Sequence, residues 1–205
     1  MTSNELDSFI ARLDNLAKKH DCVLVADLGP RASAQEINDV EEYIGAKLPA
    51  SLRTFLEMHN GILLEIHERS SREAYGEGSS PYRSLIVHGT KEIITLTDDF
   101  RGFLNVESER LRFQTHRCFE FANISGVLRR LLFFIDAPLP GGEYSIFDAD
   151  LDTHEWYHDL DAVAGRSVVP ASSFDDFLSK SLQFILETEG GFSYWVPDLE
   201  YWWPG

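Results

Sequence analysis

The chain has 205 residues, of which 43% are hydrophobic and 25% are charged. This composition is typical of a globular protein with a sizeable core, and it excludes a disordered chain, a collagen-like fibre and a coiled-coil rod. With 18 Lys and Arg against 34 Asp and Glu, the formal net charge is −16. Such acidity disfavours direct binding of nucleic acid, whose phosphates are bound through basic side chains.

The longest apolar cluster, at 131–135, has the length of a strand and falls far short of the roughly 20 apolar residues that span a membrane. The first residues contain neither the basic nor the apolar region of a secretory signal. Two cysteines, Cys22 and Cys118, are too few for a disulfide framework. We therefore expect a cytoplasmic protein that neither spans nor binds a membrane.

The acidic excess is concentrated in the last third of the chain. Residues 131–205 contain 14 acidic and two basic side chains, whereas residues 1–130 contain 20 acidic and 16 basic ones. A field of this kind attracts a basic protein partner and speeds its encounter. The alternative is that the acidity serves only to keep the protein soluble.

Helices dominate the predicted elements of the first 61 residues. Apolar residues at helical spacing predict a helix over 4–20, followed by a short strand at 22–26. Ser33 and Glu36 have the spacing of a capping box, and the helix they begin should end at Gly45. A further helix begins after Pro49 and ends at Asn60-Gly61.

Strands dominate the next hundred residues. The sequence predicts strands at 62–66, 85–87, 92–96, 118–121, 131–135, 144–147 and 168–169. It predicts a loop over 68–81, helical turns at 98–103 and 107–113, and a hairpin turn at 139–142. A final helix begins at Ser172 or Ser173 and stops before Gly190-Gly191.

This order of helices, strands and a closing helix predicts an α+β fold with a largely antiparallel central sheet. We expect one domain over 1–205. Its parts are a helical region at about 1–61, a sheet region at about 62–170, a closing helix at about 172–188 and an aromatic tail at 190–205.

Residues 154–158 match the H-E-x-x-H pattern of zinc proteases, in which two histidines one helical turn apart share the metal and the glutamate polarises water. A zinc hydrolase using His154, Glu155 and His158 is therefore an alternative. No histidine follows His158 as a third ligand, and Trp156-Tyr157 favours extended structure. We expect an accidental match, and hence no enzyme, no metal and no cofactor.

Cys118 has His116 and Glu120 two positions away on either side, so strand alternation would place all three on one face. That arrangement resembles a cysteine nucleophile with its base. However, Phe119 and Phe121 flank the cysteine. We therefore expect Cys118 to be a buried structural residue.

The end of the chain is unusually aromatic. Six of the 25 aromatic residues lie in the last 14 positions, among them Trp202 and Trp203. Trp and Tyr are enriched at the energetic centres of interfaces. They are equally suited to folding a tail back over the protein's own surface, which we favour, although Trp202 and Trp203 remain candidate contacts with a partner.

A set of residues between 36 and 61 carries a resemblance to a known family: Glu36-Ile37, Glu41, Ile44-Gly45, Leu48-Pro49, Leu52-Arg53, Phe55-Leu56 and Asn60-Gly61. They resemble the N-terminal signature of the SUKH superfamily, roughly E-x-x-[IL]-G-x-x-L-P-x-x-[YL]-[RK]-x-F-L followed by N-G. Compatible pieces recur at 118–122 and 173–178, so the resemblance covers about residues 4–188. We expect the signature residues to build the fold, with Gly45 ending a helix, Leu48-Pro49 forming a corner, Phe55 in the core and Asn60-Gly61 preceding a strand.

The resemblance implies an α+β binding module, because this superfamily includes bacterial immunity proteins that neutralise toxins and fungal regulators of cell-wall assembly. The leading hypothesis is an immunity protein that blocks a cognate toxin, for which a basic nuclease domain is the candidate. The alternative is a regulatory scaffold for endogenous proteins. The expected contacts are the acidic strand with Asp148, Asp150, Asp152 and Glu155, and Asp159 and Asp161 nearby; a strand that is merely solvated, with Phe147 and Leu151 turned inward, is the alternative. The loop at 68–81 comes second.

Overall fold

The structure, a computed structural model, describes residues 1–76, 81, 83–104, 118–124, 129–150, 168–169 and 171–187. Its elements in chain order are α1 (Ser3–Lys19), β1 (Cys22–Leu28), α2 (Ala34–Ile44), α3 (Ala50–Met58), β2 (Ile62–Glu68), α4 (Arg69–Tyr75), β3 (Arg83–Val87), α5 (Thr90–Leu104), β4 (Cys118–Ile124), β5 (Arg129–Leu139), β6 (Glu143–Asp150), β7 (Val168–Val169) and α8 (Phe174–Glu187). The predicted α+β class is confirmed.

The seven strands form one sheet in sequence order, β1 to β7, and every neighbouring pair is antiparallel. The predicted hairpin is the β5–β6 pair, whose turn contains Gly141 and Gly142, both at φ 81°. The register shifts twice, between Glu120 and Ala122 in β4 and between Phe134 and Pro138 in β5.

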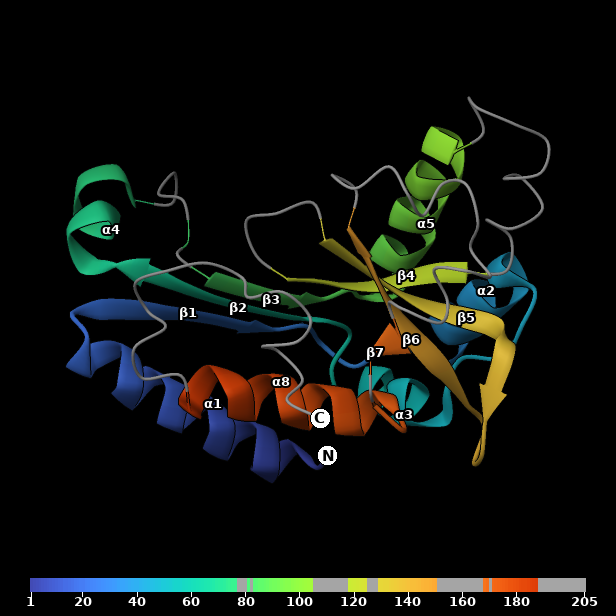
Figure 1. The fold of residues 1–205 in the computed structure, drawn as a ribbon, viewed down its shortest axis with the longest axis horizontal. Helices are drawn as coiled ribbons and strands as arrows, with labels where there is room; N and C mark the ends of the chain where they lie inside the picture. The colour runs from blue at the N-terminus through green and yellow to red at the C-terminus, as the bar shows by residue number, and fades with distance from the viewer. Residues whose placement is uncertain are drawn as a thin grey trace.

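Helices lie on both sides of the sheet. Figure 1 shows α1 and α8 side by side along one face, with α3 at the end of α8, and α5 standing on the opposite face above β4. Helix α5 also packs against α2, and α4 lies at the end of β1 and β2. Because both faces are covered, consecutive residues of one strand can both be buried.

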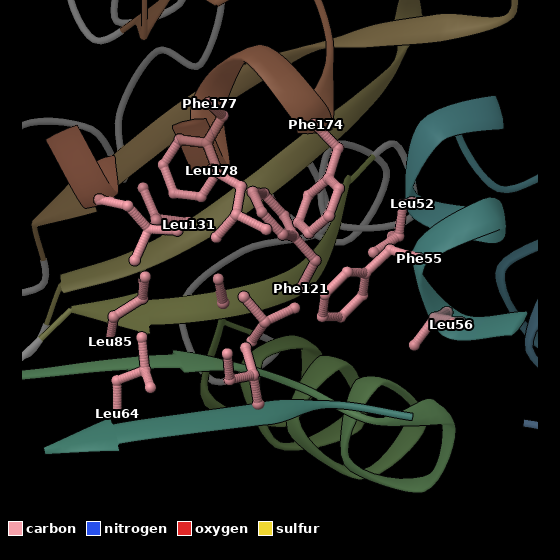
Figure 2. Packing of buried hydrophobic residues seen from close by; sticks show 14 of the residues in the cluster. Leu52, Phe55, Leu56, Leu64, Leu85, Phe121, Leu131, Phe174, Phe177 and Leu178 are labelled. Atoms are coloured by element: carbon pink, nitrogen blue, oxygen red, sulfur yellow. The ribbon is translucent and has the colours of Figure 1, made fainter. Parts of the chain in front are cut away.

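The main core lies between the sheet and the pair α3 and α8. Phe121 of β4 is fully buried there, with its ring centroid 4.1 Å from that of Phe133 and 5.5 Å from that of Phe177. Phe174 at the start of α8 contacts Phe55 of α3 at 5.1 Å. Figure 2 shows these rings meeting leucines from β2, β3 and β5. The apolar faces predicted for the first helices and the last helix therefore meet at one centre.

The helix boundaries in the N-terminal part follow from local capping. Ser33 accepts a hydrogen bond from the backbone of Glu36, whose side chain in turn bonds to the backbone of Ser33. Gly45, at φ 74°, ends α2 in the left-handed conformation, which glycine adopts without steric cost. The predicted helices over 4–20, from Ser33 to Gly45 and after Pro49 are confirmed.

Two predictions for the middle of the chain are wrong. Residues 92–96 belong to α5 and form no strand, although Ile93, Ile94 and Thr95 are β-branched and favour strands. The expected loop at 68–81 contains α4, a helix with no buried residue and therefore no apolar periodicity to predict it. The helical turn predicted at 107–113 lies outside the described residues.

Two consecutive residues at the centre of β6, Ile146 and Phe147, are both buried. Ile146 pairs with Phe133 in the main core, whereas Phe147 pairs with Leu132 on the opposite face. There Phe147 packs edge-on against Phe134 at 5.2 Å. Phe147 is thus turned inward as predicted, but toward a second apolar cluster.

Candidate functional site

The signature residues form two clusters, and the first surrounds Glu41 at the end of α2. This carboxylate is only 6% exposed and accepts hydrogen bonds from Lys47 Nζ at 2.6 Å, the Leu48 backbone N–H at 3.2 Å and Arg53 Nη1 at 3.0 Å. Burial opposes its ionisation, but the bonds from Lys47 and Leu48 and the charges of Lys47 and Arg53 hold the pKa of Glu41 below its ordinary value. Glu41 therefore fixes the corner between α2 and α3.

The corner itself is built by Leu48 and Pro49. Leu48 is buried, and Pro49 occupies the N-cap position of α3, where its missing N–H costs nothing. Helix α3 then carries Phe55 into the core against Phe174. In the structure Gly45 ends α2, Pro49 precedes α3, and Leu48 and Phe55 are buried.

The second cluster surrounds Asn60 and Gly61, where α3 meets β2. Asn60 Oδ1 accepts the Thr90 backbone N–H at 2.7 Å, so the side chain caps the N-terminus of α5. Gly29 donates its N–H to the Gly61 carbonyl at 3.0 Å, and a Cβ on Gly29 would lie 2.2 Å from the Asn60 carbonyl oxygen. Gly61 has φ 98°. Asn60 thereby ties β1, α3 and α5 together.

A third polar contact, which the sequence analysis missed, joins the hairpin tip to two helices. Glu143, 6% exposed, accepts the backbone N–H and hydroxyl of Ser51 at 2.7 and 2.8 Å. It also lies 3.4 Å from the Phe174 backbone N–H. One carboxylate thus serves the positive N-terminal ends of both α3 and α8. No local sequence pattern predicts this role of Glu143, because its partners Ser51 and Phe174 lie 92 and 31 residues away in the sequence.

A buried polar group lies on the α5 face of the sheet. His88 and Glu120 are both at most 5% exposed, and His88 Nε2 lies 3.3 Å from Glu120 Oε1. Arg130 Nη1 donates a hydrogen bond to Glu120 Oε2 at 2.9 Å. The Glu120 backbone N–H is bonded to Thr97 of α5. The Glu120 carboxylate therefore bonds to His88 and Arg130, and His116 lies outside the described residues.

Both cysteines are buried. For Cys22, burial first and the nearby charges of Glu68 and Asp21 second raise the pKa of the thiol, which keeps it in the unreactive protonated form. The prediction that Cys118 is a buried residue is confirmed, at 2% exposure.

The structure gives the backbone position of two of the predicted acidic contacts. In β6 the register places Asp148 opposite Leu131 and Asp150 opposite Arg129. The other predicted contacts lie outside the described residues, namely Asp152, Glu155, Asp159, Asp161, Trp202 and Trp203. This acidic stretch, from β6 onward, stays a predicted partner site.

The zinc alternative also falls outside the described residues, because His154, Glu155 and His158 are not among them. Within the described ranges, no group of three or more His, Cys, Asp or Glu side chains is arranged to hold a metal ion. In the same ranges, no helix combines the length and apolar character of a membrane span.

The described polar clusters are thus saturated by groups of the protein itself, and each holds separate elements in place. Beside Glu41 the surface has only an open depression, lined by Asn38, Glu41, Glu42, Gly45, Ala46 and Lys47. An arrangement of this kind holds the helices and the sheet in a fixed shape.

Comparison with known proteins agrees with this description. A family model, SMI1 / KNR4 family (SUKH-1), matches residues 31–180, a range that includes both signature clusters and the contacts of Glu143 with α3 and α8. No match was found among curated proteins. Because the family model covers well over half of the chain, the protein belongs to the SMI1/KNR4 family, SUKH-1.

Proposed function

We propose that this protein is an immunity protein that binds a cognate toxin and blocks it by occupying a basic surface. Membership of the SMI1/KNR4 family supports a protein-binding role. The observation that carries the proposal is the distribution of charge, with 14 acidic against two basic side chains in residues 131–205. A charge asymmetry of this size steers association with a basic partner.

The acidic strand β6 and the residues that follow it are the proposed contacts. Asp148 and Asp150 occupy alternate backbone positions of β6. Asp152, Glu155, Asp159 and Asp161 continue the acidic run in sequence. Carboxylates presented at such spacing can occupy a cationic groove that otherwise binds phosphates, which would inhibit a nuclease without any chemical step.

The first test is purification of a tagged form from its native host, followed by identification of proteins that co-purify in stoichiometric amount. Recovery of a protein with a basic toxin-like domain, whose toxicity is suppressed by co-expression, supports the proposal. Recovery of endogenous housekeeping proteins alone contradicts it and favours a regulatory scaffold.

Charge reversal then tests the location. Replacing Asp148, Asp150 and Asp152 by Lys should weaken binding of the recovered toxin by at least about tenfold, mostly through slower association. The matched control reverses three exposed acidic residues elsewhere, Asp7, Asp39 and Glu42, and should change affinity much less. Equal losses in both variants, measured by surface plasmon resonance, would mean that only net charge matters and that the contact lies elsewhere.

A further inference from the structure

The strand β1 forms one edge of the sheet, and its backbone pairing can be read residue by residue. Its register with β2 runs without interruption from Cys22–Glu68 to Leu28–Ile62. Just beyond the two ends, Gly29 N–H bonds to the Gly61 carbonyl, and Arg69 N–H bonds to the Asp21 carbonyl. Hydrogen-bonded and non-hydrogen-bonded pairs alternate in antiparallel strands. Odd-numbered residues of β1 therefore direct their backbone groups toward β2.

It follows that the even-numbered residues direct their backbone groups outward. These are Cys22, Leu24, Ala26 and Leu28, and among the described residues none accepts from or donates to these outward backbone groups. Ala26 is exposed, and Leu24 and Leu28 are half-buried. Within the part of the chain that the structure describes, the edge thus presents a row of unpaired backbone donors and acceptors along the full length of the strand.

Natural proteins commonly block such an edge with proline, lysine, a bulge or a very short strand. The strand β1 has seven residues, Cys-Val-Leu-Val-Ala-Asp-Leu, with no proline, no basic residue and no register shift. Its one charged residue is Asp27, which is exposed. The edge is therefore open to an additional strand, which is a common mode of peptide recognition.

The charges near this edge define what it would accept. On the face opposite α1, the odd-numbered residues Val25 and Asp27 lie beside Glu65 and Leu63 of β2, so this row contains the carboxylates of Asp27 and Glu65, the latter bonded to the buried His67. On the α1 face, Leu24 and Leu28 pack against the core. A strand laid along β1 would meet apolar surface on one face and carboxylates on the other.

We propose that the β1 edge binds an extended segment of a basic protein partner, which adds an antiparallel strand to the sheet and alternates apolar and basic side chains. The inference rests on the proposed function for the identity of that partner, the toxin, but its geometry does not depend on it. A second copy of the chain fits the edge poorly, since each copy has a net charge of −16 and β1 offers no basic residue to meet Asp27.

The probe is a synthetic peptide of the length of β1 that alternates valine and lysine, and the readout is hydrogen exchange of individual backbone amides of the full chain by NMR. With the peptide about tenfold above its Kd, exchange of the Leu24 and Ala26 amides should slow about tenfold. The amides of Val23 and Val25 are already bonded to β2 and should change little. Slowing without this alternation, or no slowing, overturns the proposal.

Two control peptides separate backbone pairing from charge attraction. A version N-methylated on the residues that face β1 keeps its charge but lacks the donors, and should lose binding. A version with glutamate in place of lysine should bind at least about tenfold more weakly. If the methylated peptide binds equally well, the contact is not strand addition. If the same amides become protected with rising protein concentration alone, the occupant is a second copy and the assignment is wrong.

Two variants at Ala26 test the same contact from the side of the protein. Ala26→Pro removes an outward N–H, which an edge strand tolerates, and should abolish peptide binding. Ala26→Ser keeps the N–H and should bind normally. Should Ala26→Pro fail to fold, the methylated peptide still decides the question on the unaltered chain. Undiminished capture of the toxin by folded Ala26→Pro would overturn the edge site and leave the immunity role standing.

Discussion

At the scale of single residues, the fold depends on buried carboxylates. Glu41, Glu120 and Glu143 are at most 6% exposed, and each accepts hydrogen bonds from groups of another element. An unpaired carboxylate at such depth would be strongly unfavourable. Removal of either partner is therefore expected to cost more than the pair itself contributes, because the remaining group stays buried without compensation.

Glu41→Gln should lower the free energy of unfolding at neutral pH by about 1–3 kcal/mol, since the amide replaces one acceptor by a donor facing Lys47 and Arg53. Glu42→Gln changes an exposed neighbour and should stay within about 0.5 kcal/mol of the parent. Urea unfolding monitored by circular dichroism measures both. Comparable losses in the two variants would show that the contacts of Glu41 are not important for stability.

The contribution of Glu41 should also depend on pH. Its pKa is lowered in the folded state, so the stabilisation is fully present above the unfolded value of about 4.3. It is lost as the pH falls through the folded pKa, because both states then bind the proton. The difference between the parent and Glu41→Gln should accordingly shrink in unfolding curves recorded between pH 5 and pH 3. A difference that grows on acidification would contradict the assigned direction.

Asn60→Ala should destabilise the protein by about 1–2 kcal/mol, as expected for loss of a helix cap, because the Thr90 N–H loses its acceptor. Asn15→Ala, on the exposed side of α1, is the matched control. Hydrogen exchange should show the loss concentrated in the first turn of α5. Uniform loss of protection across the chain would mean that Asn60 acts through the core rather than as a cap.

The sequence pattern predicted contacts between residues close in the chain better than contacts between residues far apart. Ser33, Glu36 and Gly45 act within a few positions of one another, so their spacing alone gave the ends of α2. The partners of Glu143 come from α3 and α8, and no local motif records them. Glu120 was singled out beside Cys118, yet its partners His88 and Arg130 come from other parts of the sheet.

At the scale of elements, the turn of the β5–β6 hairpin is hydrogen-bonded to the N-termini of two helices. Glu143 bonds to Ser51 in α3, Ser51 Oγ accepts the Phe174 N–H of α8 at 3.0 Å, and Gly142 accepts the Ala50 N–H. Backbone N–H groups at the N-termini of α3 and α8 therefore find their acceptors in the same hairpin turn, at Gly142 and Glu143. Figure 1 shows the start of α8 beside α3.

Glu143→Ala should destabilise the protein by about 2–3 kcal/mol, because the Ser51 N–H and hydroxyl lose their acceptor and the Phe174 N–H keeps only Ser51 Oγ. A double-mutant cycle with Ser51→Ala should give a coupling energy of at least about 0.5 kcal/mol. Asp136→Ala, on an exposed part of the same hairpin, is the control in the same unfolding assay. Strict additivity of Glu143→Ala and Ser51→Ala would exclude the shared network.

Element type was predicted well where apolar periodicity is clear and poorly where tertiary contacts decide it. The run Ile93-Ile94-Thr95 favours a strand on its own, but capping of Thr90 by Asn60 and packing on β4 and α2 make it helical. Helix α4 has no fully buried residue, and its contacts include the Arg69–Asp21 ion pair and the Ser71–Glu68 hydrogen bond. The acidic stretch was predicted from charge alone, and its backbone is described only as far as Asp150.

At the scale of the whole molecule, a net charge of −16 opposes compactness through self-repulsion. Raising the ionic strength from about 0.01 M to about 0.15 M shortens the screening length from about 30 to about 8 Å. The Tm should therefore rise by a few degrees. The variant with Asp7, Asp39 and Glu42 changed to Lys gains two charges per site, reaches −10 and should respond less. Calorimetry showing a lower Tm in salt would mean that ion pairs outweigh repulsion.

The sequential strand order has a consequence for how the protein is made. Each strand pairs with its predecessor in the chain, so a ribosome delivers the sheet in its final order and pairing can follow synthesis. The helix that covers Phe121 and Leu131 is α8, which begins only at Phe174. Until it emerges, the part of the apolar sheet face that α8 covers stays exposed on the nascent chain, so the need for chaperone protection lasts until late in translation.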